Sequence, residues 1–239
     1  MKIPQIYKYF KFLLMLKYIV DFFFPKTCYY CEKEGRYICN ECIRNYVQIN
    51  WEPKCYVCGK ACTAGLMHRE CKEQGYIDGL IYFTVYDQKI KRIIKDVKYS
   101  FYFDILNELG EIMSEYLKTY HFSDDLILTD VPLHKKKKRF RGFNQAEILA
   151  RVIAKRSGFK YCKLLNRVEN TTSQVKLSHE ERENNLINAF QFIGKDIPDK
   201  IMIVDDVFTS GSTINQCAKV LKSNGSKEVY GYVFAKSRE

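Results

Sequence analysis

The chain has 239 residues, enough for one domain of ordinary size and a small additional module. A hydrophobic content of 46% and a charged content of 28% are typical of globular proteins and argue against a disordered chain. The net charge of +11 favours anionic partners, namely phosphate ligands, nucleic acid or an anionic membrane surface, and does not choose among them.

Residues 1–24 carry apolar side chains at helical spacing, interrupted by lysines at positions 8, 11 and 17. Pro25 ends this predicted amphipathic helix. An uncharged run of about 18 residues is absent, so we do not expect the segment to span a membrane. Packing against a neighbouring domain or subunit is the favoured expectation, and peripheral contact with a membrane is the alternative. A small-residue cleavage site is also absent, so no secretory signal is expected.

Cysteine is concentrated early in the chain, where eight of the ten cysteines fall between Cys28 and Cys71. Because no secretory signal is expected, we predict a reducing, cytoplasmic setting in which the thiolates bind metal. If the N-terminal helix contacts a membrane, the protein would lie at the inner face of that membrane. Most of these cysteines, with one histidine, form close pairs with two residues between the ligands, a spacing typical of zinc ribbons. The pairs are Cys28 and Cys31, Cys39 and Cys42, Cys55 and Cys58, and His68 and Cys71.

Two such pairs complete one tetrahedral Zn²⁺ site. The nearest-pair interpretation gives an all-cysteine site within 28–42 and a site of three cysteines and His68 within 55–71. Cys62 is an alternative ligand to His68. A cross-braced, RING-like module, in which the first pair joins the third, is a second alternative. Closed four-ligand sites leave no position for a substrate, so we predict two structural zinc ions.

From about residue 76 the composition changes, and strands alternate with helices. The patterns predict strands over 80–86, 126–128, 201–204 and 228–235, and helices over 90–97, 104–119, 143–157 and 214–221. On the helix over 143–157 we expect Ile148, Leu149, Val152 and Ile153 to be buried. This alternation predicts an α/β fold with a parallel sheet flanked by helices. The predicted domains are an N-terminal helix over 1–25, a double zinc-ribbon module over 26–75 and the α/β domain over 76–239.

A basic segment follows the strand over 126–128, with six cations in the eight residues 134–141. One interpretation is a solvated loop, and the other is contact with a pyrophosphate or a nucleic-acid backbone. Arg139 and Arg141 are the stronger phosphate candidates, because a guanidinium binds phosphate bidentately. The lysines are candidates for nucleic-acid contact: Lys135, Lys136, Lys137 and Lys138. Few aromatic residues interleave here, so no base-stacking platform is evident.

The most informative stretch is 201–213, where a short apolar run is followed by Asp205, Asp206 and a loop of small residues. The loop residues are Thr209, Ser210, Gly211, Ser212 and Thr213. Backbone N–H groups at the start of the following helix can bind one anion, and glycine allows its close approach. Carboxylates beside a phosphate site suit a ligand that also carries sugar hydroxyls, with or without Mg²⁺.

This stretch resembles the ribose-phosphate motif of type I phosphoribosyltransferases. The resemblance implies that Asp205 and Asp206 hold the ribose hydroxyls of phosphoribosyl pyrophosphate (PRPP) and act as the catalytic residues. It implies that the loop 209–213 binds the 5-phosphate, with Mg²⁺ as a cofactor. Lys98, Arg139 and Arg141 are then the candidates for the pyrophosphate.

Several motifs occur together in chain order and extend the resemblance to 20–239. They are the cysteine array, Val131-Pro132-Leu133, Arg141-Gly142-Phe143-Asn144-Gln145-Ala146, a string from Arg167 through Thr172, Gln174, Leu177 and Arg182 to Asn185, and the acidic motif at 205–213. Together they resemble the ComF family (ComFC or GntX-like), in which a zinc ribbon precedes a phosphoribosyltransferase domain. The family is tied to the uptake of single-stranded DNA in natural transformation. His68 stands where that family usually has cysteine.

The resemblance leaves two hypotheses open. The chain is a Mg²⁺-dependent phosphoribosyltransferase with an unidentified acceptor, or it is a non-catalytic, PRPP-sensing competence factor. The second hypothesis implies single-stranded DNA, a competence helicase and a recombination mediator as partners. A RING-like adaptor ranks third, because it leaves 76–239 without a role.

Overall fold

The computed structural model describes residues 25–74, 76–99, 103–168 and 189–237. The chain divides into two compact units, 1–47 and 48–239, which are described separately. The domain boundaries predicted near 25 and 75 stay a prediction, and the helix predicted over 1–24 lies outside the described residues. Among the helices of the described ranges, none is both long enough and apolar enough to cross a bilayer.

Each unit contains a turn of the same design around its first close pair of cysteines. In the first unit the turn follows an antiparallel bridge between Thr27 and Glu34, and the helix α2 (Asn40–Asn45) begins just after Cys39. In the second unit the corresponding turn is closed by a bridge between Lys54 and Ala61. Two 3₁₀ helices follow it, η1 (Thr63–Gly65) and η2 (Arg69–Gln74).

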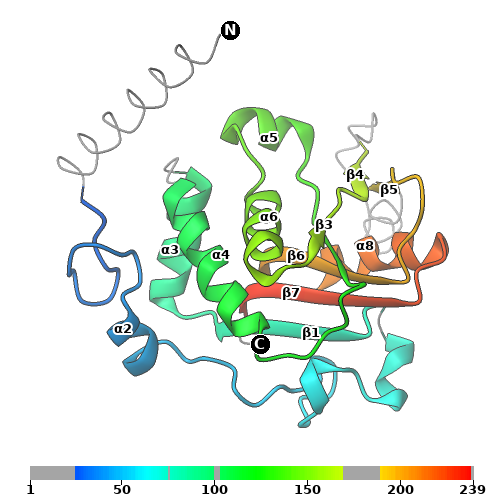
Figure 1. Cartoon of the computed structure of the whole chain (residues 1–239), viewed down its shortest axis with the longest axis horizontal. Coiled ribbons are helices and arrows are strands. Elements are labelled where there is room, and N and C mark those ends of the chain that lie inside the picture. The colour runs from blue at the N-terminus through cyan, green and yellow to red at the C-terminus, as the bar shows by residue number, and fades with distance from the viewer. Residues whose placement is uncertain (1–24, 75, 100–102, 169–188, 238–239) are drawn as a thin grey trace, which may run out of the picture. The chain divides into compact units, whose positions relative to one another are not determined.

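The second unit is built on a five-stranded, fully parallel sheet in the order β1-β7-β6-β2-β3 (Figure 1). The strands are β1 (Gly79–Val85), β2 (Ile127–Asp130), β3 (Lys160–Tyr161), β6 (Lys200–Phe208) and β7 (Glu228–Lys236). The helices are α3 (Gln88–Tyr99), α4 (Phe103–Leu117), α5 (Lys135–Arg141), α6 (Gln145–Ser157) and α8 (Ser212–Ser223). The predicted α/β class with a parallel sheet flanked by helices is confirmed.

Both faces of the central strands are buried. Ile201, Ile203 and Val233 pack in one core cluster with the apolar side of α8. On the other face, the Tyr232 hydroxyl donates a hydrogen bond to the carbonyl of Met113 in α4. This double burial explains the continuous apolar run at the start of β6, because a strand covered on both faces has no solvent-facing positions.

β6 is longer than the apolar pattern predicts and includes the acidic pair. Its pairing with β7 continues as far as Phe208 opposite Lys236, whereas its pairing with β2 ends at Val204 opposite Asp130. The backbone therefore stays extended through Asp205 and Asp206, although their side chains are polar. Beyond Val204, the β2 side of β6 is left open for a ligand.

The basic segment forms the helix α5. The interpretation of its backbone as a loop is therefore wrong. His134 caps the helix by accepting a hydrogen bond from the N–H of Lys136, and Gly142 ends it at a φ of +80°. Lysine and arginine are good helix formers, so a run of them with a cap at each end suits a helix.

Two further details differ from the sequence pattern. On α6, Ile148 and Val152 are only half-buried, whereas Ala146 and Ala150 are buried. Val152 packs against α4 at Gly110, where an added Cβ would lie 2.7 Å from the Val152 Cγ1. A small antiparallel pair, β4 (Leu165–Arg167) and β5 (Phe190–Phe192), follows the sheet's edge strand β3. The part of the motif string from Thr172 to Asn185 lies outside the described residues.

Candidate functional site

The eight predicted zinc ligands form two separate clusters. Within each cluster the ligand atoms all lie within 4.8 Å of one another. The clusters are Cys28, Cys31, Cys39 and Cys42, and Cys55, Cys58, His68 and Cys71. The grouping matches the nearest-pair interpretation, so the cross-braced alternative is wrong. Four soft ligands at this separation fit a closed, structural Zn²⁺ site.

His68, and not Cys62, completes the second cluster. Its Nδ1 lies 3.2 Å from the Cys58 Sγ, and its Nε2 lies 3.0 Å from the carbonyl oxygen of Ala61. A hydrogen bond from Nε2–H to this carbonyl would leave Nδ1 as the free metal ligand, which is the usual arrangement around a zinc-binding histidine. Cys62 packs against the cluster without joining it.

The environment of the first thiol in each cluster also suits metal binding. Burial opposes ionisation of Cys28, but backbone N–H groups of Cys39, Cys31 and Tyr30 outweigh it and lower the thiol pKa to about 6. At Cys55, burial is likewise outweighed by the backbone N–H groups of Cys58, His68 and Val57, which lower the thiol pKa to about 6. Because the thiolate is the metal ligand, these turns are prepared for a cation.

The sheet order places a crevice between β2 and β6. The chain leaves β2 through α6 toward the edge strand β3, and it leaves β6 through α8 toward β7, in the opposite direction. Right-handed crossovers in opposite directions place their helices on opposite faces of the sheet, which opens a crevice at the carboxyl ends of the two diverging strands.

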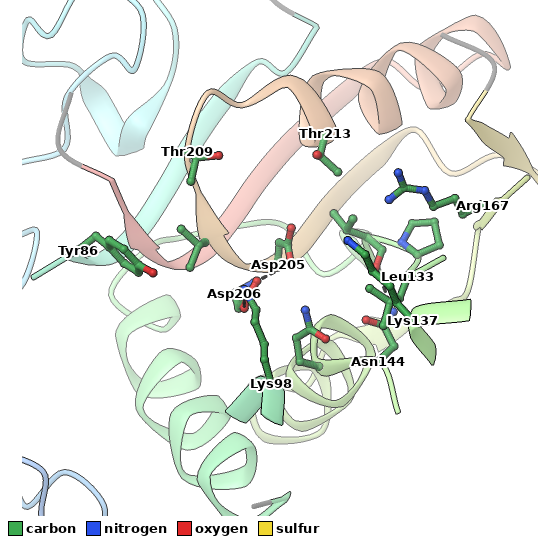
Figure 2. A pocket seen from close by; sticks show the side chains of 14 residues that line it. Tyr86, Lys98, Leu133, Lys137, Asn144, Arg167, Asp205, Asp206, Thr209 and Thr213 are labelled. Carbon is green, nitrogen blue, oxygen red and sulfur yellow. Dashed lines mark hydrogen bonds and ion pairs between the residues drawn. The ribbon is translucent and has the colours of Figure 1, made fainter. Parts of the chain in front are cut away.

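A pocket of about 320 Å³ occupies this position (Figure 2). Its lining comes from the ends of several strands and the helices that follow them. The lining residues are Tyr86, Lys98, Val131, Pro132, Leu133, Lys137, Asn144, Gln145, Arg167, Asp205, Asp206, Val207, Thr209 and Thr213. Carboxylates, cations and hydroxyls therefore meet in one cavity, which suits a ligand that carries both phosphate and hydroxyl groups.

The acidic pair lies at the centre of the pocket, and one of its members is already paired. Lys98 reaches from the end of α3 and places its Nζ 2.6 Å from the Asp206 Oδ2 (Figure 2). Burial lowers the pKa of Lys98, but the carboxylate of Asp206 outweighs burial and the net pKa is raised, so the ammonium stays charged.

Asp205 has a different electrostatic environment from its neighbour. Burial and then the adjacent Asp206 carboxylate raise its pKa well above the usual range. The backbone N–H of Asp206 donates to the Asp205 Oδ1 at 2.8 Å, which opposes this shift without cancelling it. A cation bound beside the pair would favour the ionised form of Asp205.

The loop 209–213 joins β6 to α8 beside the acidic pair. Gly211 adopts a φ of +74° and is the N-cap of α8, and the Ser210 and Ser212 hydroxyls lie 3.1 Å apart. Thr209 and Thr213 line the pocket, whereas Ser210, Gly211 and Ser212 are not among its lining residues. The first N–H groups of α8 have no partner within the helix, so they can donate to an anion.

The structure separates the predicted cations of the basic segment. Lys98 lines the pocket as expected, and Lys137 of α5 lines it as well. Arg139 is exposed and is not among the lining residues, and the Arg141 Nη1 donates to the Gln145 Oε1 at 2.6 Å. Lys135, Lys136 and Lys138 are exposed on α5, with Lys138 3.3 Å from Glu147.

Several pocket residues escape pattern reasoning. Arg167 lies at the end of β4, in the two-stranded sheet, and Tyr86 lies just beyond β1, in the five-stranded sheet, so only the tertiary fold brings them to one cavity. Two hydrogen bonds hold the Asn144 side chain in place: its Nδ2 donates to the Asp130 Oδ2 at 2.8 Å and to the Val131 carbonyl at 3.0 Å. The available signal was the Arg-Gly-Phe-Asn-Gln motif, which contains Asn144 and Gln145.

Comparisons with known proteins agree with this organisation. Residues 19–72 match the family model of the double zinc ribbon domain. The chain is 30% identical over 194 residues to competence protein ComFC of Streptococcus pneumoniae, covering 80% of this chain and 84% of that protein. It is 27% identical over 231 residues to competence protein F of Haemophilus influenzae, covering 90% of this chain and 99% of that protein.

Among solved structures, glutamine PRPP amidotransferase from B. subtilis is similar with a TM-score of 0.39 and 15% identity, covering 54% of this chain and 25% of that chain. The pneumococcal relative combines 30% identity with a match over 80% of this chain and 84% of that protein. On the strength of that relationship, the chain belongs to the ComF family of competence proteins.

Proposed function

We propose that the pocket binds PRPP with Mg²⁺ and that the protein is a phosphoribosyltransferase acting in DNA uptake. The observation that carries the proposal is the meeting of Asp205 and Asp206 with three cations, Lys98, Lys137 and Arg167, around one cavity. Carboxylates suit the ribose hydroxyls, and the cations suit a pyrophosphate group. The N–H groups at the start of α8 suit the 5-phosphate.

The chemistry follows from these assignments. Loss of pyrophosphate from PRPP leaves positive charge on the ribose, and negative charge develops on the leaving group. Asp205 and Asp206 would hold the ribose and favour its developing positive charge, while Lys98 and Lys137 would favour the departing pyrophosphate. Bound Mg²⁺ would neutralise pyrophosphate oxygens, and the acidic pair is the donor set in the pocket that suits this hard cation.

The direct test is isothermal titration of the zinc-loaded full chain with PRPP and Mg²⁺, followed by an assay of pyrophosphate release with candidate acceptors. We expect micromolar binding that is lost when Mg²⁺ is omitted. Release of pyrophosphate in the presence of one acceptor would support the enzyme. Absence of binding under these conditions would contradict the whole proposal.

A second candidate function has its own observation. The helix α5 has no buried side chains, and Phe140 is 80% exposed among its six cations. Few aromatic residues interleave with these cations, but one exposed ring beside lysines suits a single-stranded nucleic acid. A non-catalytic, PRPP-sensing factor that binds single-stranded DNA through α5 is therefore the alternative, with a competence helicase and a recombination mediator as its predicted partners.

This alternative predicts a change in salt dependence. The test replaces Lys135, Lys136 and Lys138 with Ala and keeps Lys137, which lines the pocket. The magnitude of the slope of log affinity against log salt should fall by roughly 2, because each phosphate contact contributes about 0.7 for single strands. Fluorescence anisotropy with a labelled oligonucleotide measures the slope. Replacing the exposed Lys89, Lys91 and Lys95 of α3 is the control with equal loss of charge. Equal slopes for both triple variants would contradict a role for α5.

A further inference from the structure

One side chain connects the second cysteine cluster to the loop 209–213. Tyr56 directly follows the cluster residue Cys55, and it packs both against that cluster and against the core cluster of the sheet. Its ring meets the ring of Phe208 edge-on, with the centroids 5.5 Å apart and the planes at 72°. An edge-to-face pair of this kind is stabilising and directional.

Phe208 in turn supports the loop from beneath. It is the last residue of β6, immediately before Thr209, and only 4% of it is exposed. A Cβ atom at Gly211 would lie 2.3 Å from the Phe208 Cζ, so the ring of Phe208 lies directly against the Gly211 backbone. The position of the Phe208 ring therefore sets the path of the loop.

A second connection runs through Asn215 in the first turns of α8. The Tyr56 hydroxyl donates to the Asn215 Oδ1 at 3.4 Å, and the backbone N–H groups of Tyr76 and Ile77 donate to the same oxygen at 3.1 and 3.4 Å. The Asn215 N–H donates to the Gly211 carbonyl at 2.9 Å. The start of α8, which supplies the anion-binding N–H groups, is thus tied to the segment around the second cluster.

The first cluster provides an internal comparison. Tyr29 follows Cys28 as Tyr56 follows Cys55, in turns of the same design. The ring of Tyr29 faces that of Tyr37 at 6.5 Å, within the first compact unit. At the same position of the turn, Tyr29 therefore contacts a ring of its own unit, whereas Tyr56 contacts Phe208, the residue before the loop 209–213.

We propose that Tyr56 is a positioning residue that makes the order of the loop 209–213 depend on the second metal cluster. The metal fixes the turn that carries Tyr56, the Tyr56 ring fixes Phe208, and Phe208 holds the loop in its anion-binding form. The consequence for ligand affinity rests on the proposed function, whereas the consequence for the loop does not.

The test compares Tyr56→Leu with wild type in the zinc-loaded full chain. Leu fills much of the apolar space but cannot form the edge-to-face contact or the hydrogen bond. We expect amide hydrogen exchange at 209–213 to become about three- to tenfold faster, and Mg²⁺–PRPP affinity to fall by a similar factor, which is the size of one aromatic pair. Tyr56→Phe keeps the ring and should restore most of both.

Tyr29→Leu is the matched control and should leave exchange at 209–213 unchanged. Metal analysis should find two zinc ions in every one of these variants, since neither tyrosine is a ligand. Unchanged exchange at 209–213 in Tyr56→Leu would overturn the proposal. If wild type fails to bind PRPP, the proposed function falls, but the exchange measurement still decides the role of Tyr56.

A second pair of variants tests the metal itself. Cys58 and Cys31 are the exposed ligands of the corresponding turns. Cys58→Ser should weaken zinc binding at the second cluster and speed exchange at 209–213, whereas Cys31→Ser should weaken zinc binding at the first cluster without that effect. Equal effects of the two variants on the loop would also overturn the proposal, because a specific path through Tyr56 could not produce them.

Discussion

Replacing Asp205 and Asp206 together with Asn is expected to abolish measurable PRPP binding and any turnover. The change keeps the shape of both side chains but removes the charges that accept hydrogen bonds from ribose hydroxyls. A hydrogen bond to a charged group contributes about 1.5–3 kcal/mol, so the double variant should lose roughly 10²- to 10⁴-fold in affinity. Isothermal titration with PRPP and Mg²⁺ measures the loss.

The chain offers a matched control for this experiment. Asp124 and Asp125 form a second adjacent pair, which is exposed and lies just before β2. The pocket lies at the other end of this strand. Replacing them with Asn removes the same charge but no pocket residue, so affinity should stay within about twofold. Wild-type affinity in a folded Asp205/Asp206 variant would show that PRPP does not use this pocket.

Gly211→Ala is expected to destabilise the protein more than Gly158→Ala, the same change at another glycine with positive φ at a helix end. At a φ of +74° an alanine is strained by about 1–2 kcal/mol. The new Cβ would also lie 2.3 Å from the buried Phe208 ring, and such overpacking costs about 1–3 kcal/mol. The free energy of unfolding, measured in urea, should therefore fall by about 2–5 kcal/mol.

Gly158→Ala separates these two effects. Gly158 ends α6 at a φ of +81°, and an added Cβ there would meet nothing within 4 Å. This variant should show only the backbone strain, a loss of about 1–2 kcal/mol. If both variants lost the same free energy of unfolding, the contact between Gly211 and Phe208 would have no role in stability.

The sequence predicts those parts of the site that are encoded by neighbours along the chain. The turn around each cysteine pair, the strand before Asp205 and the helix after Thr213 all depend on local patterns. Spacing favours the nearest-pair grouping and His68 over Cys62, because short turns bring close residues together, but it leaves both alternatives open. The structure groups the ligands in nearest pairs and includes His68.

Other parts depend on tertiary structure and have no local signal. The ion pair between Lys98 and Asp206 joins α3 to β6, and Arg167 enters the pocket from β4, a strand of the separate two-stranded sheet. The sequence favours Arg139 and Arg141 as phosphate ligands and assigns Lys137 to nucleic-acid contact, but the helical form of α5 gives neighbouring side chains different directions. Only Lys137 of these three lines the pocket.

The two cysteine clusters are copies of one design, yet they belong to different compact units. The two positions of this repeated turn therefore make different demands on the residue that follows the first cysteine. After Cys55, Tyr56 packs against both the cysteine cluster and the core of the sheet, so a side chain that replaces it has two sets of neighbours to fit. After Cys28, Tyr29 packs against Tyr37 of its own unit, so a replacement there has to fit that ring.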